Sequence, residues 1–147
     1  MKQATPATRR LARYLLKLEM KASDEPEGGA KVALRVFDKL QNYLSKLIGM
    51  AGFQALLARA LTLAKSESRW LEAVHIQANS HLIGFTETAL KYPNQVVTDG
   101  NVALVSQFIE LLNTFIGEAL TLRLVNDVWP EAQLNDVNFD AEETGIE

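Results

Sequence analysis

A long apolar run near the C-terminus is the feature that most limits how this chain can fold. Residues 101–129 read NVALVSQFIELLNTFIGEALTLRLVNDVW, and Pro130 follows. With Thr98-Asp99-Gly100 as a start signal and Pro130 as a stop, the run predicts one helix of about eight turns. Apolar residues cover most of its circumference, so we expect it to lie at the centre of a fold or against a partner. One narrow polar stripe remains, formed by Ser106, Glu110, Thr114, Glu118 and Thr121.

Two residues of this run predict contacts with other parts of the fold. Glu118 lies in a very apolar stretch, so its charge must be paired or exposed. A basic partner such as Arg59 or the first helix is one interpretation. The other, which we favour, is that the polar stripe faces solvent or a homodimer interface. Gly117 lowers helix propensity by about 1 kcal/mol relative to Ala, and the close approach of another helix is the expected reason for it.

The rest of the chain predicts shorter helices. Thr5-Pro6 is a good helix start, and Leu11, Leu15 and Leu18 continue at helical spacing until Pro26. Further helices are expected over 30–48 and 51–66, separated at Gly49, and the second of them carries small residues that permit close helix contact. Residues 71–85 alternate apolar and polar and predict a small β-hairpin, and a short helix over 86–92 follows. The fold class is therefore mainly α: a bundle of four to five helices with a hairpin inserted before the long C-terminal helix.

Composition supports one soluble domain. The chain has 147 residues, of which 48% are hydrophobic and 22% charged. This balance favours a packed core over disorder, and we expect one domain over 1–130 followed by an acidic tail over 131–147. The absence of cysteine excludes disulfides and thiolate chemistry. No secretory signal is recognisable, so a cytoplasmic location is expected.

The segment from Leu47 to Ala64 is the most membrane-like part of the chain. Arg59 lies well inside it, and the segment is only marginally long enough to cross a bilayer. The sequence therefore favours a core helix here and no membrane span.

The formal net charge of −3 conceals a strong asymmetry. Residues 1–70 hold thirteen of the fifteen Lys and Arg against six acids, and residues 71–147 hold two bases against twelve acids. The basic excess is most ordered in the first helix, as a stripe of Arg9, Arg10, Arg13, Lys17 and Lys21. Such a stripe fits phosphates, an anionic membrane surface, or the protein's own acidic tail. No nucleic-acid-binding motif accompanies it.

Catalytic residues are scarce. His75 and His81 flank the proposed hairpin turn and would face each other across it, but a metal site needs a third ligand whose position nothing fixes. No nucleophile elbow, phosphate-binding glycine loop or paired-carboxylate spacing is present. We therefore expect no enzyme activity, no catalytic residues, no bound metal and no cofactor.

Two segments resemble known proteins. GFQALLARALTLAKSE (52–67) and TFIGEALTLRLVNDVWP (114–130) resemble segments of small bacterial helical proteins to which no activity is assigned. The resemblance implies a bacterial origin and transfers no functional residue. The leading hypothesis is a non-enzymatic adaptor or assembly protein that binds another protein or a second copy of itself through an apolar helical surface. The alternative is a nucleic-acid-binding regulator that uses the basic first helix.

Overall fold

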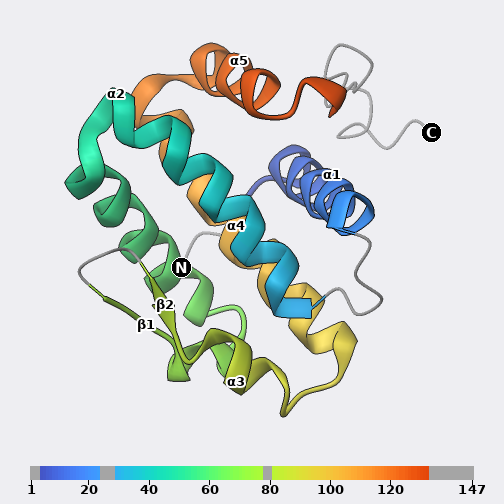
Figure 1. The fold of residues 1–147 in the computed structure, drawn as a ribbon. Helices are drawn as coiled ribbons and strands as arrows, with labels where there is room; N and C mark the ends of the chain where they lie inside the picture. The colour runs from blue at the N-terminus through green and yellow to red at the C-terminus, as the bar shows by residue number, and fades with distance from the viewer. Residues whose placement is uncertain (1–3, 24–28, 78–80, 133–147) are drawn as a thin grey trace.

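The computed structural model describes residues 4–23, 29–77 and 81–132, and the predicted acidic tail lies almost entirely outside these ranges. The fold is a helical bundle with one two-stranded hairpin, as the sequence predicts (Figure 1). In chain order the elements are α1 (Pro6–Ser23), α2 (Gly29–Lys65), the 3-10 helix η1 (Arg69–Ala73), β1 (His75–Ile76), β2 (Leu82–Ile83), α3 (Phe85–Ala89), α4 (Asn94–Ile116), α5 (Glu118–Val128) and the 3-10 helix η2 (Pro130–Ala132).

Helix α1 begins where the sequence predicts. The Oγ1 of Thr5 accepts a hydrogen bond from the backbone N–H of Thr8 at 3.2 Å, which satisfies one of the free amide groups of the first turn. Pro6 is the first helical residue, and its missing N–H costs nothing at that position. The apolar side of α1 then packs against α2 and α4 through Leu11, Ala12, Leu15 and Leu16.

Helix α4 forms the centre of the fold. Every residue from 101 to 109 is buried, because α4 lies behind the first half of α2 and beside α1 (Figure 1). The ring of Phe108 lies 5.5 Å from the rings of both Phe37 and Phe53, centroid to centroid. The apolar circumference of this segment is therefore covered by the protein's own helices.

The prediction of one long helix over 101–129 is wrong at its start and in its middle, whereas its end near Trp129 agrees with the structure. Helix α4 begins at Asn94, directly after Pro93, so Asp99 and Gly100 lie inside the helix and do not cap it. The segment breaks at Gly117, whose φ of 94° and ψ of 151° separate α4 from α5. Almost only glycine adopts this backbone region, and the local sequence does not reveal that Gly117 uses it.

The expected reason for Gly117 is also wrong. A Cβ placed on Gly117 would meet no atom within 4 Å, so no other helix approaches it closely. Close packing occurs instead at Gly100, where a Cβ would lie 2.4 Å from Nε1 of Trp70. Gly117 thus supplies backbone freedom, and Gly100 supplies space.

Replacing Gly117 with Ala is expected to lower the free energy of unfolding by about 2 kcal/mol, because the side chain forces a strained backbone. In a continuous helix the same change would raise it by about 1 kcal/mol. Urea denaturation of the unchanged chain and of Gly117→Ala gives the sign of the change in the free energy of unfolding. A variant more stable than the unchanged chain would contradict the break between α4 and α5.

Helix α2 turns back on itself at Gly49, as the sequence predicts. Gly49 has φ 81° and ψ 162°, and the helical residues before and after it run in opposite directions (Figure 1). Among the described helices, α2 is the one whose length and composition would allow it to cross a membrane, with a mean hydropathy of 1.5 over an 18-residue window. In this fold Phe53, Leu57 and Leu61 of the second half pack into the core.

The hairpin is short and its two histidines are not opposite each other. His75 pairs with Ile83 and Ile76 with Leu82, while the N–H of Gln77 donates to the carbonyl oxygen of His81 at 2.9 Å. The predicted juxtaposition of His75 and His81 across the turn is therefore wrong. The two residues of the predicted turn, Asn79 and Ser80, lie outside the described residues.

Candidate interaction surfaces

The basic stripe of α1 is divided between the fold and the surface. Arg9 forms an ion pair with Oε1 of Glu67, and Oε2 of the same carboxylate accepts the side-chain N–H of Gln107 at 2.8 Å. Arg10 is half-buried. Arg9 therefore joins α1 to the end of α2, and it is not the free phosphate-binding group that its sequence position indicates.

Three of the five predicted cations remain on the surface. Arg13, Lys17 and Lys21 are exposed at i, i+4 and i+8 of α1. They share one side of the helix. This smaller group is the part of the predicted basic site that the structure leaves open.

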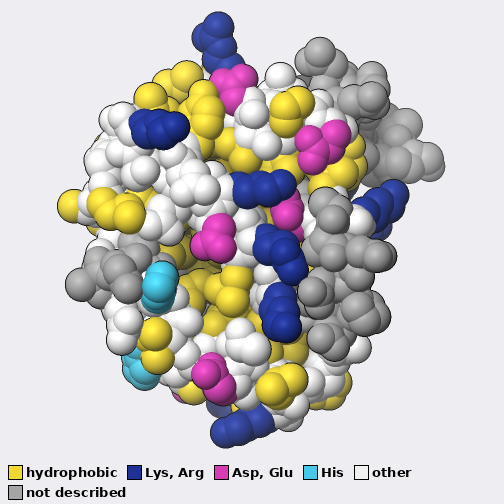
Figure 2. Space-filling view, viewed as in Figure 1, with side chains coloured by type: hydrophobic (Ala, Val, Ile, Leu, Met, Phe, Trp, Pro, Cys, Tyr) yellow, Lys and Arg dark blue, Asp and Glu magenta, His cyan; other side chains and the backbone are white. Residues whose placement is uncertain are grey.

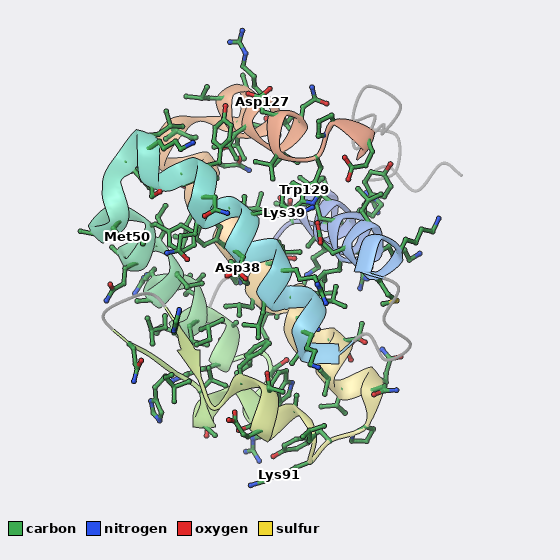
Figure 3. The ribbon with its side chains drawn as sticks, viewed as in Figure 1. Asp38, Lys39, Met50, Lys91, Asp127 and Trp129 are labelled. Carbon is green, nitrogen blue, oxygen red and sulfur yellow. The ribbon has the colours of Figure 1, made fainter. Side chains whose placement is uncertain are left out.

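A buried carboxylate on α1 escaped the sequence analysis. Glu19 is only 2% exposed, and it forms an ion pair with Lys39 of α2. Its Oε2 also accepts the indole N–H of Trp129 at 2.8 Å, and Nζ of Lys39 lies 6.0 Å from the centre of that ring. Trp129 and Lys39 thus meet where α1, α2 and the end of α5 come together (Figure 3). The available signal was that Glu19 follows Leu15 by four residues, on the apolar side of α1.

A second polar contact joins α2 to α5. The hydroxyl of Tyr43 donates to Oδ2 of Asp127 at 2.7 Å. This hydrogen bond raises the pKa of Tyr43 above its usual range, and desolvation and the charge of Asp127 raise it further, while Arg123 opposes them. The contact is structural and offers no acid or base at neutral pH.

The polar stripe predicted on the long helix does not form one surface. Ser106 is fully buried, and the carboxylate of Glu110 accepts the N–H of Thr5 at 2.9 Å. Thr114 and Glu118 are exposed, but they lie on opposite sides of the break at Gly117. These residues therefore do not form one continuous solvent-facing stripe, because Ser106 and Thr121 are buried and the chain changes direction at Gly117.

Glu118 itself follows the solvent-exposed interpretation. It is exposed at the first position of α5, and within the described ranges it forms no ion pair with Arg59 or with α1. Thr121, the last member of the predicted stripe, is buried and donates its hydroxyl to the carbonyl oxygen of Gly117 at 2.8 Å.

His75 and His81 are both exposed. In residues 4–23, 29–77 and 81–132, no three His, Cys, Asp or Glu side chains gather closely enough to hold a metal ion.

The second half of α2 carries an apolar surface that the rest of the fold leaves open. We call it the α2 outer face. Ala51, Ala55 and Ala58 share one side of the helix after the bend at Gly49, and Leu47 and Met50 lie at the bend itself. Leu47 is 60% exposed and Met50 is 46% exposed. The small residues Ala51, Ala55 and Ala58, which permit close helix contact, are thus exposed among the residues that the structure describes.

More exposed apolar side chains lie at the same end of the molecule. Helix α5, which begins directly after the break at Gly117, contacts α2. Phe115 is 61% exposed and Leu120 is 46% exposed on either side of that break. Large apolar side chains left in water at one end of a fold are typical of an interaction surface.

A cavity of about 290 Å³ lies between α2 and the hairpin, and we call it the α2–hairpin pocket. Its floor is apolar and comprises Leu34, Phe37 and Phe53, and its wall is formed by Leu82 and Ile83. Figure 2 shows this hollow as an apolar floor with acidic and histidine side chains on one side and Lys and Arg side chains on the other.

The rim of the α2–hairpin pocket is polar. Asp38, Gln41 and His81 line it. The three groups come from α2 and from the residue before β2, which are forty residues apart in the sequence, so local patterns give no sign of the pocket.

Comparisons with known proteins assign this chain to no family. The function is therefore inferred from the surfaces themselves. The chain matches no protein-family model, no curated protein and no solved structure.

Proposed function

We propose that this protein is a non-enzymatic interaction protein that binds an acidic amphipathic helix of a partner on the α2 outer face. The supporting observation is that Ala51, Ala55 and Ala58 are exposed beside Leu47 and Met50, in a helix apolar enough to be a core element. The sequence hypothesis placed the apolar interaction surface on the long C-terminal helix, whereas the proposal places it on the second half of α2. Residues 101–109 of α4 are buried by the protein's own helices, so this segment does not need a partner to cover its apolar side chains.

The geometry of the α2 outer face suits a helix. Ala51, Ala55 and Ala58 follow each other at i, i+4 and i+7, so they form a shallow strip without long side chains. Small contact residues let two helices approach to the short end of the usual 8–10 Å separation. Burying Leu47 and Met50 beside the strip would add about 1.5–3 kcal/mol for each side chain that becomes fully covered.

Charge identifies the kind of helix that fits. Residues 39–66 contain four bases and no acid, namely Lys39, Lys46, Arg59 and Lys65. Lys46 and Arg59 are exposed at the two ends of the strip. A partner helix with flanking carboxylates would complement them, whereas a second copy of this face would bring like charges together.

Photo-crosslinking in the producing cell tests the proposal. A benzoylphenylalanine at position 55 is expected to capture a partner that the same group at position 17, on α1, does not capture. The dissociation constant of the purified partner is then measured against the unchanged chain and against Ala55→Glu. We expect Ala55→Glu to weaken binding at least tenfold, or about 1.4 kcal/mol, because it places a carboxylate against an acidic helix.

Ala73→Glu is the matched control, because Ala73 is also exposed but lies on η1. It is expected to leave the dissociation constant within about twofold. Three results would overturn the proposal: no specific capture at position 55, equal binding by Ala55→Glu, or a binding segment without acidic residues. A dimer in light scattering that Ala55→Glu dissociates would identify a second copy as the occupant and would also overturn it.

The alternative of nucleic-acid binding through α1 has less support. Arg9 is engaged by Glu67, and Arg10 is half-buried, so Arg13, Lys17 and Lys21 are left for phosphates. Each phosphate neutralised contributes to affinity by counterion release, and three exposed cations contribute less than five.

A further inference from the structure

We propose that the α2–hairpin pocket binds a small amine with an aromatic or branched aliphatic body, in its cationic form. The pocket shares no lining residue with the α2 outer face, although Gln41 of its rim contacts Met50 of that face.

The floor of the pocket is rigid and apolar. Phe37 and Phe53 are almost fully buried, and both pack against Phe108 of the central helix with ring centroids 5.5 Å apart. Rings held in this way form a fixed apolar floor that does not collapse into the cavity. An apolar group of a ligand would gain by covering Leu34, Leu82 and Ile83, which line the same cavity and are partly exposed.

The rim supplies one unmatched negative charge. Asp38 is exposed, and among the described residues its carboxylate has no ion pair and no hydrogen-bond partner. Of the described lining residues, Asp38 is the one that carries a carboxylate. An ammonium group at the rim would pair with Asp38 while its apolar body covers the floor.

Gln41 provides a second acceptor beside Asp38. Its side-chain N–H₂ donates to the sulfur of Met50 at 3.2 Å, which orients the amide and leaves its carbonyl oxygen to accept. An ammonium group has three donors, so it can use both the carboxylate and the amide oxygen.

The volume limits the ligand to a small molecule. A cavity of about 290 Å³ is at the lower end of ligand pockets. At roughly 30 Å³ for each water-sized group, it holds about ten non-hydrogen atoms. Phenethylamine, with a phenyl ring and a primary ammonium, has this size and chemistry and serves as the probe.

The test is a titration of the isotopically labelled chain with phenethylamine, followed by amide chemical shifts. We expect saturable shifts at residues 34–41, 53 and 81–83, with a dissociation constant of about 1 mM for a ligand of this size. Asp38→Asn is expected to raise that constant at least fivefold. Glu72→Gln, which changes an exposed carboxylate on η1, is expected to leave it unchanged.

The anion 3-phenylpropionate tests the sign of the charge, because Lys31 and Arg35 lie on the same helix as Asp38. At equal concentration it is expected to leave the pocket residues unshifted. The proposal would be overturned by tighter binding of the anion, by equal binding of phenethylamine to Asp38→Asn, by shifts confined to other surfaces, or by no saturable shift.

Discussion

Replacing Trp129 with Ala is expected to lower the free energy of unfolding by about 3–5 kcal/mol, the range for truncating a large buried aromatic side chain. Trp129 is fully buried although it lies near the end of the described chain. Its indole lies directly after α5 and contacts Glu19 of α1 and Lys39 of α2. Urea denaturation followed by circular dichroism measures the change.

The size of this effect comes from two losses. One is the apolar area of the indole and the cavity that Ala would leave. The other is the N–H that donates to Glu19, a carboxylate that is 2% exposed. A buried carboxylate deprived of a donor keeps only its ion pair with Lys39.

Trp129→Phe separates the two losses. It keeps most of the ring but removes the N–H, so we expect a loss of about 2 kcal/mol, the value for a hydrogen bond to a charged group. If Trp129→Ala changed the free energy of unfolding by less than about 1 kcal/mol, the end of α5 would not be fixed to α1 as described.

Replacing Gly100 with Ala is expected to lower the free energy of unfolding by about 3 kcal/mol, at the upper end of the cost of overpacking. A Cβ at this position would lie 2.4 Å from Nε1 of Trp70 and 2.7 Å from two carbons of the same ring. The indole cannot easily move, because it packs against Phe85 and donates its N–H to the carbonyl oxygen of Val96.

Sequence reasoning alone gives the opposite sign for this change. Gly100 lies within α4, and Ala in a helix interior is more stable than Gly by about 1 kcal/mol. A double-mutant cycle with Trp70→Phe checks the cause, because the smaller ring vacates the space that the new methyl group needs. We expect Gly100→Ala to cost clearly less in the Trp70→Phe background, and an equal cost in both would assign the effect to something other than the Trp70 contact.

Local sequence patterns predicted correctly those structural features that depend on a single short segment. The start of α1 at Thr5-Pro6, the turn at Gly49, the hairpin and the buried first part of α4 all follow from caps, glycine and the periodicity of apolar residues. These features depend on residues a few positions apart, which the sequence displays directly.

The candidate surfaces were predicted less completely. The sequence singled out the small residues Ala51, Ala55 and Ala58, but it could not tell whether the contact they permit is made inside the protein or left for a partner. It also grouped Arg9 with the surface cations, because nothing local shows that Glu67 lies fifty-eight residues away as its partner.

The sequence by itself therefore determined the helical class, the core helix and most helix boundaries. Only the tertiary structure decided that Gly117 breaks the last helix, that Gly100 makes room for Trp70, and that Glu19 is buried against Trp129. Each of these depends on contacts between residues far apart in the chain, or on a backbone conformation that glycine permits without requiring. A local pattern carries no information about either.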